Sequence, residues 1–243
     1  MDVSAPMRHG PVELRLIRAK DARSLQHELI TNRRWLQPWE ATLPGLQTGI
    51  DMRVSIRRLL QQYRDGTGYP FVMEYDGKIA GQLNIWGVMR GSLCSATIGY
   101  WVSERFAGHG ITPAAVAMAT DLAFNELGLH RIEICLRPEN RPSLRVVQKL
   151  GFRYEGMRRR FIHIDGDWRD HLAFSLVRED VPEGVLSRWA SGRVPADWGA
   201  VPASDLPSTA APGDAGLPGD AAAPGDAGLP GDAGLHREHG MQG

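Results

Sequence analysis

A strand that enters a helix through a glycine loop constrains the fold more than any other feature of this chain. The pattern predicts the strand over 95–102, the loop around Gly108 and Gly110, and the helix over about 112–127. Thr112 is a suitable N-cap, and the proline after it is tolerated in the first helical turn. Because a helix N-terminus presents unpaired N–H groups and partial positive charge, the loop is either a structural turn or a phosphate cradle.

Phosphate-binding loops differ in the residues that they require. A Walker loop needs Gly-Lys-Ser/Thr, and no lysine stands here, so that loop is excluded. A dinucleotide fingerprint needs a third glycine where Pro113 stands, and it follows the first strand rather than the fourth. A third pattern, Arg/Gln-x-x-Gly-x-Gly/Ala, is matched by Arg105, Gly108 and Gly110. Alone, so short a pattern does not separate a phosphate loop from a turn.

The rest of the body alternates between strand and helix patterns. Asp76-Gly77 between two apolar runs is a strong hairpin signal, and Asp21 is predicted to cap a short helix. Asn140 and Gly151 mark the two ends of another helix. The further predicted ranges are strands at 12–18, 130–137, 152–163 and 168–177, and helices at 21–29 and within 49–66. The order β-α-α-β-β-β-α-β-α-β-β predicts a mixed α/β layer.

Composition and charge argue against several classes of function. The 243 residues carry a formal net charge of zero, which argues against general binding to nucleic acid or to a membrane surface. No apolar run approaches the length of a membrane span. Cys94 and Cys135 lie in apolar runs without metal-site spacing. They predict buried thiols in a reducing cytoplasm and no metal site.

The C-terminal residues have a different composition. From Pro212 to Leu235 the chain repeats the hexads PGDAGL and PGDAAA, with at most one leucine in each copy. So little apolar surface does not offset the entropy of ordering, so we expect disorder. The predicted divisions are an N-terminal arm (1–10), a folded domain (11–181), an extension (182–202) and a disordered tail (203–243).

Eight ordered matches make the chain resemble the GNAT N-acetyltransferases over roughly 11–180, most densely the ribosomal-protein-alanine enzymes of the RimJ/RimL type. One match is the glycine loop. The others are NRRWLQPWE (32–40), VMRGS (88–92), GYWV (99–102), HRIE (130–133), PENRPS (138–143), KLGFRYEG (149–156) and IDGDWRDHLAFSL (164–176). The resemblance implies a mixed, mostly antiparallel, centrally splayed sheet flanked by helices, with acetyl-CoA as cosubstrate.

The resemblance also implies where acetyl-CoA lies. Its pantetheine arm would run along 95–102, with the Val102 N–H as an oxyanion donor. The glycine loop would hold the pyrophosphate, and the His109 side chain would point to solvent. Asn140 is expected to face the pantetheine, to cap a helix, or to do both. The full set of expected contacts is Trp101, Val102, Arg105, Ala107, Gly108, His109, Gly110, Ile111, Thr112, Asn140 and Ser143.

Acetyl transfer to an α-amine needs little help from a base, because the pKa of such an amine is about 8. Glu40, Glu133 and Glu155 are the candidate bases, and Glu40 is preferred. Trp35 and Trp39 either form an apolar acceptor wall beside Glu40 or belong to the core. Ser143, Tyr154 or water is expected to protonate the leaving thiolate.

The functions of two other features are not fixed by these patterns. The arginines of MRRRF (157–161) lie on a predicted strand, where the outer two would face one way and the middle one the other. They predict a solvated hairpin or, less simply, a site for an acidic substrate or for the nucleotide 3′-phosphate. His171 is expected to anchor the last strand.

We predict acetylation of a protein N-terminal amine, with a ribosomal protein as a candidate partner. The alternatives are a small-amine acetyltransferase, for an antibiotic or a polyamine, and a non-catalytic acetyl-CoA sensor. A homodimer is left open.

Overall fold

The described strands form one eight-stranded sheet, which the glycine loop meets near its middle. The computed structural model describes residues 3, 5–44 and 51–207. The strand order is β1-β2-β3-β4-β5-β6-β8-β7, and every neighbouring pair is antiparallel except β5 and β6. The predicted mixed, mostly antiparallel α/β fold is therefore confirmed. The bounds are Met7–His9 (β1), Val12–Leu16 (β2), Gly68–Tyr75 (β3), Lys78–Met89 (β4), Ser95–Val102 (β5), Arg131–Leu136 (β6), Arg153–Ile164 (β7) and Asp167–Val177 (β8).

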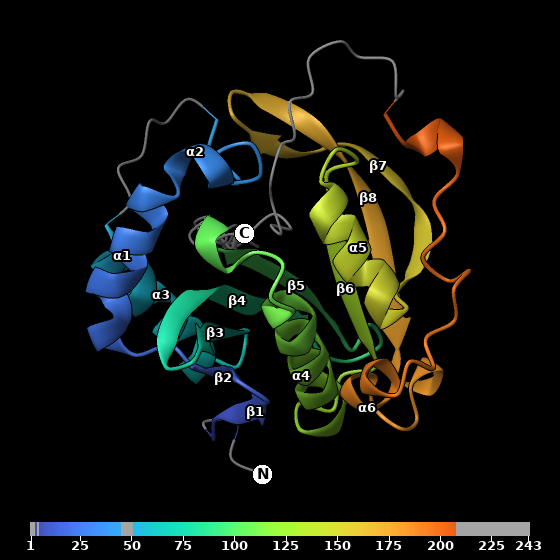
Figure 1. Ribbon diagram of the computed structural model, residues 1–243, viewed down its shortest axis with the longest axis horizontal. Helices are drawn as coiled ribbons and strands as arrows, with labels where there is room; N and C mark the ends of the chain where they lie inside the picture. Colours follow the sequence, from blue (N-terminus) through green and yellow to red (C-terminus); the bar gives the residue numbers. More distant parts are fainter. Residues whose placement is uncertain (1–2, 4, 45–50, 208–243) are drawn as a thin grey trace, which may run out of the picture.

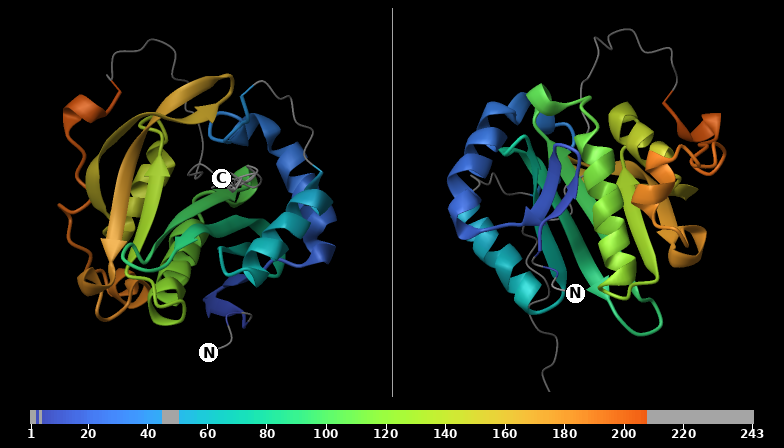
Figure 2. Two further views of the ribbon diagram at one scale, coloured as in Figure 1. Left: turned by 180° about the vertical axis from the view of Figure 1, so that it is seen from behind. Right: turned by 60° about the horizontal axis from the view of Figure 1, so that its bottom comes forward.

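Helices cover the two faces of the sheet unequally (Figure 1). A large apolar core lies under α4 and α5, and a smaller one under α1, α2 and α3. The latter helices pack mainly on β3 and β4, so β7 and β8 stand without a helix in front of them when seen from behind (Figure 2, left). No described helix is long and apolar enough to cross a membrane. The bounds are Ala22–Thr31 (α1), Arg33–Leu36 (α2), Met52–Arg64 (α3), Ile111–Asn125 (α4), Arg141–Leu150 (α5) and Val185–Ala190 (α6).

The parallel pair β5 and β6 separates part-way along its length. Its last paired residues are Thr97 and Glu133, yet β5 continues to Val102 and β6 to Leu136. Beyond Thr97 the backbone of β5 is thus exposed along one edge inside the sheet. This splay is the opening that the resemblance implied.

Local chemistry explains several of the predicted ends. Asp76 and Gly77 both hold positive φ, 48° and 73°, which is the geometry of a tight hairpin turn. Asn140 caps α5 through a hydrogen bond from the Ser143 N–H, and Gly151 ends that helix with φ 70°. The hairpin and this helix are confirmed.

One predicted cap is confirmed in position and the other is wrong. Asp21 is the N-cap residue of α1, but its carboxylate makes no capping bond; it accepts hydrogen bonds from the Arg18 N–H and the buried Arg15 side chain, and α1 continues to Thr31 rather than ending at Leu29. Thr112 lies inside α4, whose N-cap is Gly110 with φ 74°. A glycine in this left-handed conformation makes the sharp entry into α4 that a threonine would resist.

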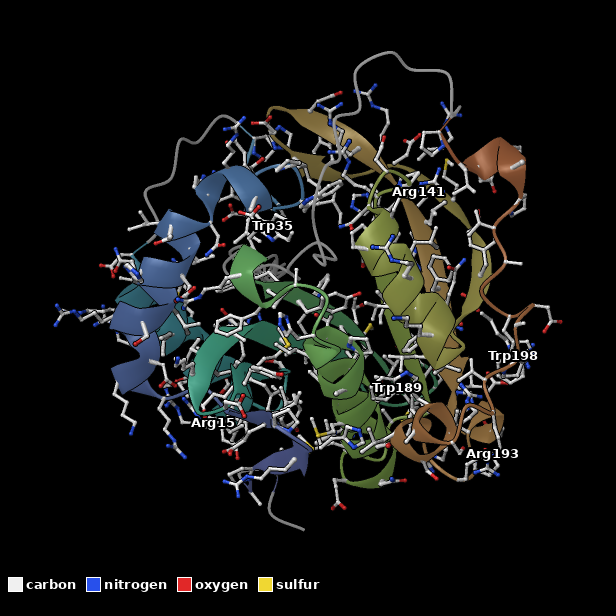
Figure 3. All side chains as sticks on the ribbon, viewed as in Figure 1. Arg15, Trp35, Arg141, Trp189, Arg193 and Trp198 are labelled. Atoms are coloured by element: carbon white, nitrogen blue, oxygen red, sulfur yellow. The ribbon has the colours of Figure 1, made fainter. Side chains whose placement is uncertain are left out.

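The segments outside the predicted domain are partly docked. Residues 7–9 of the arm pair with β2 as β1. In the extension, Asp121 of α4 accepts hydrogen bonds from the first N–H groups of α6, and Trp198 lies against the Arg153 guanidinium, 3.6 Å from its Cζ to the ring centre (Figure 3). Tyr154 donates a hydrogen bond to Asp205 (2.5 Å), so the docked chain extends beyond the expected boundary at residue 202. The hexad repeats lie outside the described residues.

Candidate active site

The end of β5 presents the main-chain N–H and C=O of one residue to the open edge. The Ser103 N–H donates to the Ala80 carbonyl (2.8 Å), so the next residue pair, Val102 opposite Gly81, is a non-hydrogen-bonded pair of the antiparallel ladder. The N–H and C=O of Val102 therefore point away from β4 and into the splay. The main chain of Trp101 is turned toward β4, so of the two expected pantetheine partners only Val102 presents main-chain groups to the splay.

The indole of Trp35 holds the main chain of Val102 from the carbonyl side. Its Nε1–H donates to the Val102 carbonyl at 3.0 Å, and both groups are buried. Figure 3 shows Trp35 projecting from α2 toward the centre of the molecule. The carbonyl of Val102 is held by Trp35 of α2, and the preceding peptide is held by the ladder pair of Trp101 with Gln82, so the Val102 N–H has a fixed direction. A preorganised amide of this kind suits the negative charge that develops on an acyl oxygen.

Gly81 allows β4 to approach this point closely. A Cβ added there would lie 2.1 Å from the Trp101 carbonyl oxygen and 2.9 Å from the Val102 Cα. No side chain fits without moving the end of β5. The glycine is thus part of the site, although a lone glycine in a strand pattern gave no signal of it.

The glycine loop forms an open cradle at the N-terminus of α4. Gly108 and Gly110 hold φ 80° and 74°, and a Cβ added to either would meet no atom within 4 Å. The first N–H groups of α4 have no partner within the helix, and Pro113 lacks one altogether. The Thr112 hydroxyl is buried beside them without a hydrogen-bond partner among the described residues. An unpaired hydroxyl, helix N–H groups and free space fit a pyrophosphate.

Residues of α1 anchor the start of the loop. Glu28 forms an ion pair with Arg105 and accepts a hydrogen bond from Ser103 Oγ (2.7 Å), while the Asn32 side chain accepts one from the Glu104 N–H (2.9 Å). The Arg105 guanidinium is thus held by its ion pair with Glu28 of α1. Sequence reasoning missed Glu28, although a buried glutamate on the inner face of a helix is an unusual feature that calls for a partner.

The remaining loop and helix residues lie around the splay. Ile111 is buried, Ala107 is half-buried, and the His109 ring is exposed but packs 5.5 Å from the ring of Tyr75. Ser143 is fully buried and shares a 2.7 Å hydrogen bond with the Tyr100 hydroxyl. This bond joins β5 to the start of α5. Tyr100 is a further residue of the site that the sequence did not indicate.

The acceptor-side candidates lie where α2 meets the β7–β8 hairpin. Trp35 and Trp39 are both buried in the smaller core, which confirms the core alternative for them. Glu40 follows them and forms an ion pair with Arg33. The Arg137 guanidinium lies 5.4 Å from the Trp39 ring centre and donates to the Pro38 carbonyl (2.8 Å). The turn after α2 is thereby tied to the far side of the splay.

Glu133 lies where β5 and β6 separate, on the sheet face opposite α4, but it is doubly paired. Arg131 (2.8 Å) and Arg158 (2.7 Å) both reach its carboxylate. Burial acts to raise the pKa of Glu133, yet the hydrogen bonds from these arginines bring it below its ordinary value. A hydrogen bond from Arg131 likewise lowers the pKa of Glu155. Both carboxylates are therefore weak bases.

The Tyr154 side chain is directed away from the Glu133 carboxylate and its arginine partners. Its ring packs on Phe174, and its hydroxyl donates to Asp205 in the C-terminal segment. Burial and this hydrogen bond raise the pKa of the phenol. The contacts favour a structural anchor over the expected proton donor.

Two buried polar residues of β4 were not predicted. Gln82 Nε2 donates to Asn84 Oδ1 at 3.0 Å, and both side chains are nearly inaccessible. Their partners in the β4–β5 ladder are Trp101 and Gly99. Because Trp101 belongs to the smaller core, both side chains lie on the sheet face that α1, α2 and α3 cover. The signal was present in "GQLNIW", where polar residues occupy inward positions of an apolar strand.

Known proteins share this arrangement. The family model described as an acetyltransferase (GNAT) domain matches residues 12–153. The chain belongs to the GNAT acetyltransferases. It is similar to probable N-acetyltransferase YjcK of Bacillus subtilis, at 39% identity over 43% of this chain and 58% of that protein. It is 29% identical to the ribosomal protein uS5-alanine N-acetyltransferase of Escherichia coli, over 74% of this chain and 90% of that protein.

A solved structure extends the comparison. RimJ of Mycobacterium smegmatis in complex with CoA-disulfide superimposes with a TM-score of 0.70 at 38% identity, covering 78% of this chain and 93% of that one. GNAT acetyltransferases use acetyl-CoA. The predictions of the GNAT family, the RimJ-type resemblance and acetyl-CoA as cosubstrate are confirmed.

Proposed function

We propose that this chain transfers the acetyl group of acetyl-CoA to the N-terminal α-amine of a protein, with a ribosomal protein as the expected acceptor. The observation that carries the proposal is the Val102 N–H, which points into the splay beside the glycine loop. The name of the E. coli relative, a ribosomal protein uS5-alanine N-acetyltransferase, supports the choice of acceptor.

In the proposed reaction the neutral amine attacks the thioester carbon from the α2 side of the sheet. The Val102 N–H donates to the oxygen that becomes negative, and the buried surroundings strengthen that bond. The amine must lose a proton, and the leaving thiolate must gain one. An α-amine is about one-tenth neutral at pH 7, so the paired carboxylates of Glu40 or Glu133 suffice as bases acting through water.

The carboxylates argue against a polyamine as acceptor. A polycation needs several carboxylates free to bind it, yet Glu40, Glu133 and Glu155 each form an ion pair with an arginine. Replacing an internal arginine with a ligand ammonium group gains little. A single α-amine makes no such demand.

The test is thiol release from acetyl-CoA with two sets of peptides. One set begins with free Ala or Ser, and the matched set has a blocked N-terminus and one free lysine. Turnover confined to the free N-termini is the expected result. Turnover on the blocked lysine peptides alone contradicts the proposal. Bound acetyl-CoA without turnover on either set indicates a small-amine acceptor or a sensor.

A further inference from the structure

The arginine run on β7 does not alternate as its sequence predicts. The register of β7 against β8 shifts between Arg158 and Ile162, and Arg160 holds a positive φ of 47°. This bulge turns Arg159 and Arg160 to the same hollow, whereas Arg158 reaches Glu133 on the sheet face. The expected arrangement, with Arg158 and Arg160 on one side and Arg159 on the other, is wrong for that reason.

The hollow has a volume of about 370 Å³ and an excess of positive charge. It lies between the β7–β8 hairpin and the turn after β6. Four of its lining residues are arginines, two are acidic and one is an exposed tryptophan. They are Arg137, Arg159, Arg160, Arg169, Glu139, Asp170 and Trp168.

The acidic groups here are already engaged. Glu139 accepts from Arg137 (3.2 Å), Asp170 accepts from the Arg160 backbone N–H (2.7 Å), and the nearby Asp167 pairs with both Arg160 (3.3 Å) and Arg169 (3.5 Å). Within the described part of the chain, no acceptor is found for the exposed Arg159 side chain or for the buried Nε–H of Arg169. A buried donor without an acceptor is costly, so this hollow is suited to a ligand that brings acceptor oxygens.

The hollow adjoins the acceptor side of the splay. Arg137, which lines it, also donates to the Pro38 carbonyl and lies over Trp39. Ala41 forms a β-bridge with Ile164 beside these contacts. One wall of the hollow is therefore in contact with the segment that follows α2. A peptide whose N-terminus enters the splay past α2 would have its next residues near the arginines.

We propose that this hollow binds acidic side chains of the acceptor protein, a few residues after the acetylated N-terminus. The inference rests on the proposed function. Arginines bind carboxylates by paired, charge-assisted hydrogen bonds, and Arg159 is the group with none of these engaged. A nucleic acid fits less well, because the chain carries no net positive charge with which to bind a run of successive phosphates.

The experiment measures kcat/KM for three peptides that begin with free Ala and differ at two adjacent positions, which carry Asp, Asn or Lys. The pair is moved along the peptide from position 3 to position 8 to find the register. We expect the Asp peptide to exceed the Asn peptide by roughly tenfold at its best register, through a lower KM, with the Lys peptide poorest. The preference should shrink in high salt.

Arg159→Glu tests the hollow itself. It should remove the preference for Asp while leaving kcat/KM for the Asn peptide within about twofold. Arg57→Glu is the matched control, because Arg57 is exposed on α3 and changes the net charge equally. That variant should keep the wild-type preference.

Each outcome decides one of the two proposals. Equal rates for Asp and Asn peptides at every register, or a preference unaffected by Arg159→Glu, overturn the acidic-acceptor site and leave N-terminal acetylation intact. Inhibition by single-stranded RNA that Arg159→Glu relieves would also overturn it, since the hollow would then bind phosphates. Failure to acetylate any peptide, with acetyl-CoA bound, overturns the proposed function and this inference with it.

Discussion

Gly110 shows how one residue can serve the cosubstrate rather than the fold. Its φ is 74°, and an added Cβ would meet no protein atom within 4 Å. A valine there would strain the backbone and place methyl groups in the space that the helix N–H groups face. We expect Gly110→Val to raise the Kd for acetyl-CoA by at least about tenfold, measured by calorimetry. Gly128→Val is the control, because Gly128 has a similar φ of 64° and equal space beyond the other end of α4. Equal affinity in the two variants would remove the loop from the binding site.

Also at the scale of single residues, His171 makes the stability of the fold depend on pH. It is fully buried, with Nδ1 near the Arg169 carbonyl (3.0 Å), and burial lowers its pKa to about 4. The unfolded chain, with a histidine pKa of about 6.5, therefore takes up the proton more readily. The stabilisation from neutral His171 is complete above pH 6.5 and is lost as the pH falls through 4, by up to about 3 kcal/mol.

Urea unfolding at pH 7, 5.5 and 4 measures this loss. In His171→Gln the fall in the free energy of unfolding between pH 7 and 4 should be smaller than in the wild type. His27→Gln, at an exposed position of α1, should leave the fall unchanged. An unchanged fall in His171→Gln would show that other groups carry the acid sensitivity.

At the scale of elements, the sequence predicts those helices and strands whose ends are marked by particular residues close by. The β3–β4 hairpin and α5 could be predicted because Asp76-Gly77, Asn140 and Gly151 mark their ends within a few residues. The four-residue α2 could not, since it is too short to show a helical period. It is held by burial of its tryptophan and leucine and by the indole hydrogen bond to β5.

In the site, too, the sequence indicates the local motifs but not the contacts between residues far apart in the chain. The glycine loop and the Asn140 cap are local motifs, so the sequence indicated them. The contacts from Trp35 to Val102 and from Glu28 to Arg105 join residues more than sixty positions apart, and no spacing rule contains them. The arginine run was misread because a β-bulge broke the alternation on which the prediction depended.

At the scale of the whole molecule, the C-terminal extension acts as a clamp that holds β7 and α5. The Tyr154 N–H donates to the Trp198 carbonyl, Gln148 donates to the Gly199 carbonyl, and Tyr154 reaches Asp205. Leu206 packs against the main core. The sequence predicts that the hexad repeats add no stability, because they contain too little apolar surface to offset ordering.

Two truncations separate the clamp from the repeats. A chain ending at Pro207 should keep the full Tm, whereas a chain ending at Pro202 should lose about 1–2 kcal/mol with the hydrogen bond to Asp205 and the packing of Leu206. Tyr154→Phe in the full chain removes the hydrogen bond alone and should lie between them. Thermal unfolding followed by circular dichroism measures all three. An equal Tm for both truncations would place the end of the stabilising chain at or before residue 202, and a lower Tm for the chain ending at Pro207 would assign a stabilising role to the repeats.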